Sequence, residues 1–421
     1  MNALAVMPNG DLVAGGQFVH ANASTVNRIA RWNGSSWAPL GSGVSGVGTN
    51  PAVYALAALS NGDLVAGGNF ATAGGVAASF IARWNGASWA PLGAGMSNVV
   101  SALAVMPNGD LVAGGGFVRA GGVTVNYVAR WNGSSWAPLG MGMDGGVLAL
   151  AVMPNGHLIA GGYFTTAGGV TVNNIARWDG SSWQPLGSGV DGSVRALAVL
   201  PNGDLAVGGS FTTAGGATAN RIARWDGSSW APLSSGVSGG GGSGSSVDAL
   251  AALPSGDLVA GGLFTTAGGA TANRIARWNG SSWVSLGTGV DGVVSALRVL
   301  PGGKLVAGGY FGIAGGLSST YWARWTDTGI PWVARQPAAQ SVNAGQTVTL
   351  SAACASGYDF NGPVSFQWLR NGVPIADGPG GASAGGGTVS GASGALPSPT
   401  NGAAATLIIV GAQPSDAGQY S

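Results

Sequence analysis

Short apolar runs alternate with glycine-rich turns along most of the chain, and this pattern indicates β-strands. A typical run is Val147–Met153, which ends at the turn sequence Pro154–Gly156. Asn-Gly between apolar runs is the strongest short hairpin signal, and it predicts type I′ turns with positive φ at both central residues. Helix formers are scarce, because Glu is absent, Lys304 is the only lysine and there are 80 glycines. The sequence therefore predicts an all-β protein.

One sequence unit recurs seven times over the first three quarters of the chain. Its Arg-Trp pair recurs most often 47 residues apart, with tryptophan at Trp32, Trp84, Trp131, Trp178, Trp225, Trp278 and Trp325. A Gly-Gly-x-Phe sequence recurs in step with it, with phenylalanine at Phe18, Phe70, Phe117, Phe164, Phe211, Phe264 and Phe311. We number these units repeats 1 to 7.

Each repeat divides into four short strands, which we call a, b, c and d. In repeat 5 they are expected at Ala196–Leu200, Leu205–Phe211, Arg221–Trp225 and Trp230–Leu233. Four short strands in a unit of this length are typical of one blade of a β-propeller. We therefore expect a seven-bladed β-propeller over residues 1–328, with blade seven lacking strand d because its sequence stops after Trp325.

The repeats resemble those of kelch-type propellers, which have Gly-Gly after a strand and tryptophan in the last strand. Gly208, Gly209, Trp225 and Trp230 occupy those places in repeat 5. The repeats are more similar still to those of bacterial surface repeat proteins and of the fungal cortical polarity marker, which carry similar Ile-Ala-Arg-Trp text. The resemblance implies a propeller that binds partners, and these differ between members of such families.

Residues 329–421 resemble an immunoglobulin-like domain. Gln346–Ala353 alternates like a strand and leads to Cys354, Trp368 has the position of the buried strand-C tryptophan, and Leu407–Val410 reads as strand E. Asp416–Tyr420 is similar to the tyrosine-corner motif. The resemblance implies an incomplete Ig-like β-sandwich, which ends before its second cysteine and its last strand.

Two further features complete the expected domain organisation. The Gly/Ser-rich stretch 377–401 has no strand pattern and is expected to be a disordered loop. Met1 corresponds to Val100 of repeat 3, in the middle of a repeat. We therefore expect this chain to be an internal fragment of a longer protein, so the absence of a signal peptide says nothing about export.

The order of the strands sorts the connections onto two faces of the propeller. The a–b and c–d turns share one face, which we call the tight-turn face. The b–c loops and the links from strand d to the next strand a share the other, the loop-rich face. Both long insertions, Ser45–Pro51 and Ser238–Ser246, fall on the loop-rich face. Variation gathered on one face is a mark of a binding face, although tolerated drift explains it equally well.

Candidate ligand-binding residues on the loop-rich face are Asp144, Asp191, Asp291, Arg119 and His20. The three aspartates follow strand d, where they would form part of a ring for a cation or a basic ligand. Each is flanked by glycine, so an ordinary turn is the alternative. His20 reads equally well as a solvated loop histidine.

Other repeated residues read as architecture. One aspartate occupies the same position of the a–b turn in five repeats and is expected to cap the hairpin, at Asp11, Asp63, Asp110, Asp204 and Asp257. His157 replaces that aspartate in repeat 4. The arginine before each repeat tryptophan is expected to stack on an aromatic ring of the adjacent blade. The thirteen repeat tryptophans are expected to be buried between blades, the alternative being exposed platforms for sugars.

Composition and charge exclude several classes of function. The net charge is +1 with 7 % charged residues and no basic cluster, so nothing supports nucleic-acid or anionic-membrane binding. No apolar run approaches the roughly 20 residues of a membrane span. Cys354 is the only cysteine, so no internal disulfide can form. No catalytic triad, phosphate loop or metal-ligand cluster is present, and no cofactor is expected.

The leading hypothesis is a non-enzymatic binding or adhesion module of an exported bacterial cell-surface protein. The propeller would present an unknown protein or glycan ligand, the Ig-like domain would act as a spacer, and the chain would be a monomer. The alternative is a propeller lectin that binds glycans through repeated Trp-containing sites. A third hypothesis is a hydrolase that works through carboxylates and arginines on the loop-rich face.

Overall fold

The protein is all-β throughout the part that the structure, a computed structural model, describes. The described residues are 1–21, 24–46, 50–241, 244–325, 332–335, 341, 343–355, 364–371, 373–379, 388–391, 393–396, 404–410, 412 and 414–417. Within these ranges the C-terminal region has one short helical element, a single 3₁₀ turn at Pro414–Asp416. No helix there is long and apolar enough to cross a membrane.

Repeat 3 shows how each repeat folds into one antiparallel sheet. Its four strands are β14 (Val100–Val105), β15 (Leu111–Gly115), β18 (Val128–Trp131) and β19 (Trp136–Pro138). They lie in that order across the sheet, so the predicted strands a to d are neighbours in sequence and in space.

The other repeats form equivalent sheets. Repeats 1 and 2 comprise β1 (Ala3–Val6), β2 (Leu12–Gly15), β5 (Ile29–Trp32), β6 (Trp37–Pro39), and β8 (Ala52–Ala58), β9 (Leu64–Asn69), β12 (Ile81–Trp84), β13 (Trp89–Pro91). Repeats 4 and 5 comprise β20 (Val147–Val152), β21 (Leu158–Gly162), β24 (Ile175–Trp178), β25 (Trp183–Pro185), and β26 (Val194–Val199), β27 (Leu205–Gly209), β30 (Ile222–Trp225), β31 (Trp230–Pro232). Repeats 6 and 7 comprise β33 (Ser246–Ala252), β34 (Leu258–Leu263), β37 (Ile275–Trp278), β38 (Trp283–Ser285), and β39 (Val293–Val299), β40 (Leu305–Tyr310), β43 (Trp322–Trp325).

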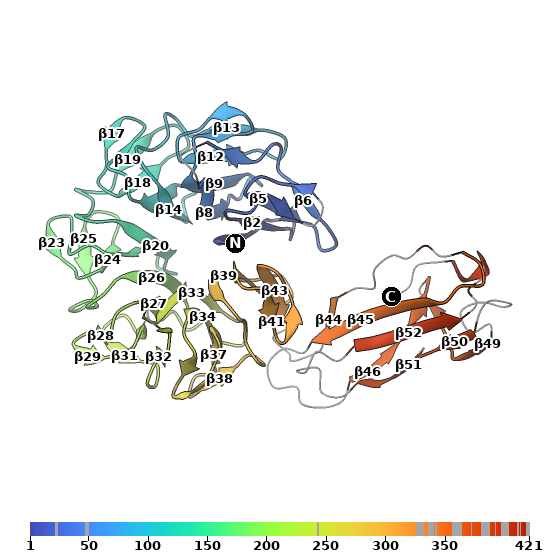
Figure 1. Ribbon diagram of the computed structural model, residues 1–421. Coiled ribbons are helices and arrows are strands. Elements are labelled where there is room, and N and C mark those ends of the chain that lie inside the picture. The colour runs from blue at the N-terminus through green and yellow to red at the C-terminus, as the bar shows by residue number, and fades with distance from the viewer. Residues whose placement is uncertain are drawn as a thin grey trace. The chain divides into compact units, whose positions relative to one another are not determined.

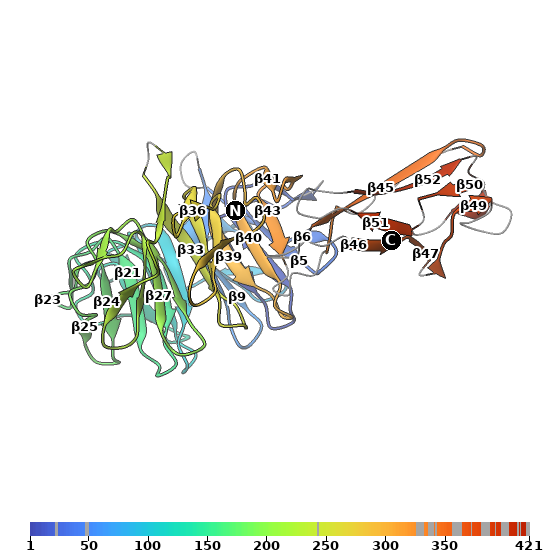
Figure 2. The ribbon, with the colours of Figure 1, turned by 90° about the horizontal axis from the view of Figure 1, so that it is seen from below.

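The sheets are arranged around a common axis. Each innermost strand contacts the innermost strands of the repeats before and after it, and β39 of repeat 7 contacts β1 of repeat 1. Figure 1 shows the sheets in this circular order, and in Figure 2 the turns and hairpins gather at the two ends of the strands. This arrangement is a propeller-type fold.

The a–b turns differ in type from the prediction. In repeat 3 the Met106 N–H donates to the Asp110 carbonyl at 2.8 Å, and the Gly109 N–H donates to the Met106 carbonyl at 2.9 Å. Gly109 has a φ of 87°, whereas Asn108 does not have positive φ. The expected type I′ turn is therefore wrong, because only the glycine takes the left-handed conformation, as in a three-residue loop with a bulge.

The b–c connections contain two-stranded hairpins that the sequence pattern did not reveal. They are β3 (His20–Ala21) with β4 (Ser24–Thr25), β10 (Thr72–Ala73) with β11 (Val76–Ala77), β16 (Arg119–Ala120) with β17 (Val123–Thr124), β22 (Thr166–Ala167) with β23 (Val170–Thr171), β28 (Thr213–Ala214) with β29 (Ala217–Thr218), β35 (Thr266–Ala267) with β36 (Ala270–Thr271), and β41 (Ile313–Ala314) with β42 (Leu317–Ser318). The links that follow strand d pair with them, through β7 (Val44–Ser45) to β10 and through β32 (Val237–Ser238) to β35. The pairing confirms that links and b–c connections share one face.

Adjacent sheets approach each other most closely at the first glycine of the Gly-Gly pair. A Cβ atom added to Gly114 of repeat 3 would lie 2.5 Å from Cγ1 of Val147 in repeat 4. The same close approach joins Gly67 to Val100 and Gly161 to Val194. Strand b of repeats 1 to 6 therefore has a glycine where the next repeat inserts a valine, and Gly308 of repeat 7 meets Met1 in the same way.

The strand-d tryptophans add a hydrogen bond across the same boundary. The Trp136 indole N–H donates to the Leu92 carbonyl of repeat 2 at 3.1 Å, and Trp183 donates to Leu139 of repeat 3 at 2.9 Å. Equivalent bonds join Trp89 to Leu40, Trp230 to Leu186 and Trp283 to Leu233. The predicted burial is confirmed for Trp89, Trp136, Trp183 and Trp283, of which Trp136 is 5 % exposed, whereas Trp230 is only half-buried. Most Arg-Trp tryptophans are only half-buried, so full burial is wrong for them.

By its internal contacts the chain divides into two compact units. One comprises Met1–Ser285, Val290–Gly312 and Ser319–Ala323, and the other Leu286–Gly289, Ile313–Ser318 and Arg324–Ser421. The C-terminal unit contains a sheet ordered β44 (Trp332–Arg335), β45 (Val348–Ala355), β52 (Ala404–Val410), β50 (Thr388–Ser390) and β49 (Gly378–Pro379). Two further pairs are β46 (Val364–Gln367) with β51 (Ser393–Leu396), and β47 (Leu369–Arg370) with β48 (Val373–Pro374).

The C-terminal unit agrees with part of the sequence interpretation. Strands lie at the two predicted places, and Trp368 is buried with 2 % exposure. The prediction that 377–401 contains no strands is wrong, because two strands within it, β50 and β51, pair with β52 and β46. The Cys354 side chain, the Tyr420 corner and the 328/329 boundary lie outside what the structure describes.

Replacing Gly114 with alanine is expected to destabilise the propeller, because the new Cβ would overlap the Val147 side chain. Overpacking of this kind costs about 1–3 kcal/mol. Urea unfolding followed by circular dichroism measures the loss.

The matched control is Gly116→Ala, two positions along the same segment, where an added Cβ would meet only the Asn98 amide nitrogen at 3.9 Å. A double variant, Gly114→Ala with Val147→Ala, should recover part of the loss because the overlap is removed. Equal stabilities for the two single variants would show that the glycine is not needed for docking.

Candidate functional site

Two of the predicted ligand aspartates fasten a hairpin on the loop-rich face. Asp144 Oδ1 accepts hydrogen bonds from the Thr165 and Thr166 N–H groups, both at 2.9 Å, and Oδ2 accepts one from the Thr165 hydroxyl at 2.6 Å. Asp191 makes the same three bonds to the two threonines of repeat 5, at 2.6–2.8 Å. Burial disfavours ionisation, but the hydrogen bonds from Thr165 and Thr166 outweigh it and lower the pKa of Asp144.

The residue at the equivalent position of other links also accepts hydrogen bonds from the next repeat. Asp291 accepts a hydrogen bond from the Gly312 N–H at 2.8 Å. Ser97 accepts bonds from the N–H groups of Val118 and Arg119 through its hydroxyl, at 3.1 and 3.0 Å. These residues each join a link to the hairpin of the next repeat, so this arrangement favours the turn interpretation over a ring of ligands.

His20 and Arg119 occupy one structurally equivalent position. Each begins the first strand of a b–c hairpin, β3 in repeat 1 and β16 in repeat 3, and each is exposed. The equivalent residues are Thr72, Thr166, Thr213, Thr266 and Ile313. The structure therefore places His20 and Arg119 on the loop-rich face of separate repeats, as side chains that vary on a constant backbone.

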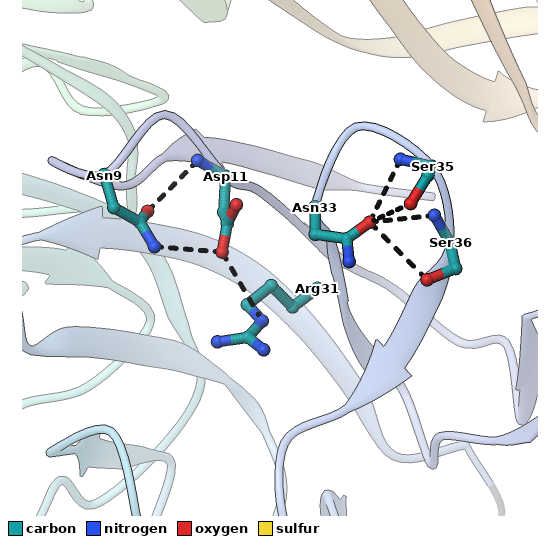
Figure 3. A network of polar contacts seen from close by, with 6 residues as sticks. All are labelled: Asn9, Asp11, Arg31, Asn33, Ser35 and Ser36. Carbon is teal, nitrogen blue, oxygen red and sulfur yellow. Dashed lines mark hydrogen bonds and ion pairs between the residues drawn. The ribbon is translucent and has the colours of Figure 1, made fainter.

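A polar network recurs on the tight-turn face, and Figure 3 shows it for repeat 1. Asp11 Oδ2 accepts a hydrogen bond from the Asn9 amide at 3.0 Å and lies 3.6 Å from Nε of Arg31. The Asp11 N–H donates to Asn9 Oδ1 at 3.1 Å. The aspartate thus closes the a–b turn, as expected, and also binds the arginine of strand c.

The second half of the network lies at the c–d turn. Asn33 Oδ1 accepts hydrogen bonds from the N–H groups of Ser35 and Ser36, at 3.0 and 2.9 Å, and from the Ser35 hydroxyl at 2.9 Å. These bonds fix which end of the amide faces the turn. The amide nitrogen of Asn33 points away from the turn, with no partner drawn among the residues of Figure 3.

The Asp–Arg ion pair recurs in five repeats, with N···O distances of 3.2–3.6 Å, as Arg31–Asp11, Arg83–Asp63, Arg130–Asp110, Arg224–Asp204 and Arg277–Asp257. In these five repeats the guanidinium group therefore has a carboxylate partner in its own repeat, and its stacking on an aromatic ring of the adjacent blade stays a prediction. Most of these arginine side chains are about half exposed, so each pair contributes little to stability.

Repeat 4 lacks the pair. His157 stands in place of the aspartate, and its ring nitrogen Nδ1 lies 3.3 Å from the Asn155 amide. Nε of Arg177 is buried and has no hydrogen-bond partner among the described residues. Repeat 4 therefore keeps the arginine without the carboxylate, as does repeat 7, where Lys304 stands in place of the aspartate and Arg324 is the arginine.

A cavity of about 300 Å³ opens on the tight-turn face at the boundary of repeats 2 and 3. Repeat 2 contributes the turn at Ser60 and Asn61 and the Arg83 side chain. Repeat 3 contributes polar and aromatic groups from its a–b turn and the end of strand c, chiefly Asn108, Asp110, Trp131 and Asn132.

Sequence reasoning missed this cavity because it treated the uniform face as purely structural. Two signals were present. Asp and Arg recur at one fixed spacing in five repeats, which marks them as partners. Ser60 also stands where every other repeat has proline in the same turn. In the described part of the chain, no three His, Cys, Asp or Glu side chains gather closely enough to hold a metal ion.

The sequence model of one family matches part of the chain. The family is described as a domain of unknown function, DUF5122, with a β-propeller fold, and it matches residues 154–178, 200–225 and 253–281. These segments lie in repeats 4, 5 and 6 and each runs from the a–b turn to the end of strand c. No curated protein matches the sequence.

Several solved structures have a similar fold. Two structures of the extracellular domain of BT4673 from B. thetaiotaomicron, described as a one-component or hybrid two-component system, each have a TM-score of 0.51 and 11 % identity. They cover 93 % and 94 % of this chain, and this chain spans 44 % of each of them. The extracellular domain of BT3049 from the same organism has a TM-score of 0.49 and 9 % identity, over 89 % of this chain and 46 % of that one. At such low identity the likeness shows the fold alone, an all-β propeller.

Asp144→Asn is expected to reduce stability above about pH 4 and to matter less in more acidic solution. The Asp144 pKa is lowered in the folded protein, so its ionised form contributes stability above the unfolded pKa. That contribution is lost as the pH falls through the lower folded pKa. Urea unfolding of both proteins at several pH values between about 2.5 and 7 measures the difference. A difference that does not change with pH would contradict this role.

His157→Asp is expected to stabilise the propeller by about 1 kcal/mol, because it gives Arg177 the carboxylate that five other repeats have. Thermal unfolding at pH 7 measures the gain, and His157→Asn is the control of similar size without charge. If both variants gain equally, the ion pair is not the cause.

Proposed function

We propose that this chain is a non-enzymatic binding or adhesion module of an exported bacterial cell-surface protein, with the propeller as the ligand platform. Two of the solved structures with a similar fold are of the extracellular domain of a bacterial protein, which supports this location. The ligand is a protein or a glycan, and the chain acts as a monomer.

The observation that carries the proposal is that the backbone of the b–c hairpin recurs while its first side chain varies between repeats. Its backbone pairing and its anchor to the link recur, while its first residue changes from His20 to Arg119 to Ile313. A rigid backbone that displays different exposed side chains at equivalent positions is suited to recognition of a partner. His20 and Arg119 are therefore proposed contact residues, and Asp144, Asp191 and Asp291 are proposed to set the hairpins that carry them.

The proposal that the chain is not a hydrolase rests on how its carboxylates are used. Asp144 and Asp191 each accept three hydrogen bonds from threonines, and their pKa values are lowered, so they favour the ionised form. A general acid needs a raised pKa near neutrality. The aspartates of the a–b turns are held by an asparagine and an arginine.

We further propose that the seven sheets are seven blades of kelch-like type. The order β44-β45-β52-β50-β49 and the buried Trp368 support an Ig-like domain as the spacer that follows.

A second candidate function is a propeller lectin with repeated Trp-containing sites. It is favoured by the tryptophans at the end of strand c, which are half-buried rather than enclosed, at Trp32, Trp84, Trp131, Trp178, Trp225 and Trp278. Trp131 lines the cavity between repeats 2 and 3.

The proposal predicts that the chain is displayed outside the cell and contacts its partner through the loop-rich face. A photo-crosslinking amino acid at Arg119, in the chain on intact cells of the producing bacterium, should form covalent adducts on irradiation. The same amino acid at the exposed Ser181, in the c–d turn on the tight-turn face of repeat 4, is the control.

Antibody labelling of unpermeabilised cells tests the location in the same samples. Labelling that appears only after permeabilisation would contradict export. Adducts at Ser181 but not at Arg119 would assign binding to the other face and favour the second candidate.

A further inference from the structure

We propose that the cavity between repeats 2 and 3 on the tight-turn face binds a neutral saccharide. This proposal rests on the binding function proposed above. The cavity holds about 300 Å³, which is at the lower end of the range for small-ligand pockets and suits one or two sugar rings. The occupant is inferred from the groups that line it.

The first group is the Trp131 side chain. One side of its ring system packs against Trp136, with ring centroids 5.3 Å apart, and against Gly93, whose added Cβ would lie 3.3 Å from the ring. The rest of the half-buried ring lines the cavity. A fixed aromatic surface beside polar groups matches the apolar C–H face and hydroxyl rim of a sugar.

The second group is the Asn132 amide. Its Oδ1 accepts hydrogen bonds from Ser134 and Ser135, so the turn fixes the amide and directs Nδ2 elsewhere. Across the residues that the structure describes, Nδ2 has no hydrogen-bond partner. The structure thus holds a donor in place before any ligand arrives, which lowers the entropic cost of binding.

The third group is a balanced set of charges. Arg83 from repeat 2 is half exposed and uses Nε to pair with Asp63 at 3.5 Å. Asp110 from repeat 3 pairs with Arg130 through Oδ2 at 3.5 Å. Each charge that lines the cavity already has its counter-ion, while the remaining N–H groups and carboxylate oxygen offer both donors and acceptors. Such a lining suits neutral hydroxyl groups better than an ion.

Ser60 distinguishes this boundary from the others in sequence. The other six repeats have proline in this place, at Pro8, Pro107, Pro154, Pro201, Pro254 and Pro301. Serine is smaller than proline and adds a hydroxyl, so it leaves room and one more polar group. The boundary of repeats 3 and 4 lacks three of these features, because Pro107, His157 and Asp179 replace Ser60, Asp110 and Asn132.

The test uses the full chain labelled with 5-fluorotryptophan and ¹⁹F NMR. The probes are glucose, galactose, mannose and N-acetylglucosamine, with their β-linked disaccharides. The Trp131 signal is assigned with Trp131→Phe and the Trp178 signal with Trp178→Phe. We expect at least one probe to shift the Trp131 signal in a saturable way and to leave the Trp178 signal unchanged.

Two variants that natural repeats already tolerate then test the lining. Asn132→Asp keeps the turn, since Asp179 accepts the same serine bonds at 2.8 Å, but it removes the amide donor. It should weaken binding about five- to tenfold. Ser60→Pro should weaken it at least as much by filling the cavity. Asn279→Asp in repeat 6 is the matched control and should change nothing.

Failure of this inference differs from failure of the proposed function. No shift with any probe, equal shifts of Trp131 and Trp178, or unchanged affinity in both variants would overturn the saccharide site. Crosslinks from Arg119 on intact cells would still support the platform. Saccharide binding by a chain that is never labelled on intact cells would uphold the site and overturn the surface location.

Discussion

The propeller depends on the close approach between a glycine of one repeat and a valine of the next. At 2.5 Å from an added Cβ to Val147 Cγ1, the Gly114 position excludes any side chain. The valine enters the core there, and at the same boundary the Trp183 indole N–H of strand d donates to the Leu139 carbonyl of repeat 3. An apolar contact near the axis and a polar one further out fix the angle between sheets. All exposed groups take their positions from that angle.

The sequence was sufficient to predict the repeat, the strands and the division into two faces, because each follows from local patterns. Contacts between strands were not predictable in this way. The turn type depends on paired hydrogen bonds between Met106, Asp110 and Gly109 rather than on the Asn-Gly dipeptide. The strand at Thr388–Ser390 forms because it pairs with β52, although its Gly/Ser-rich surroundings carry no alternation.

The candidate site was predicted least well, since variation was taken as the only mark of function. The loop-rich face does vary, yet Asp144 and Asp191 fasten hairpins there. On the uniform face the repeats differ in single residues whose effect appears only in space. Ser60 matters because Arg83, Trp131 and Asn132 converge beside it. None of these residues is unusual alone.

The uniform boundaries have a consequence for how such a chain can change over time. Repeats 2 to 5 each carry a valine and a tryptophan for the repeat before, and a glycine and a leucine for the repeat after. A duplicated unit therefore arrives with both of its contacts already compatible with any neighbour. Copy number is limited by the geometry of closing a ring and not by the invention of new interfaces. A single substitution such as proline to serine then gives one copy an individual role while its neighbours preserve the scaffold.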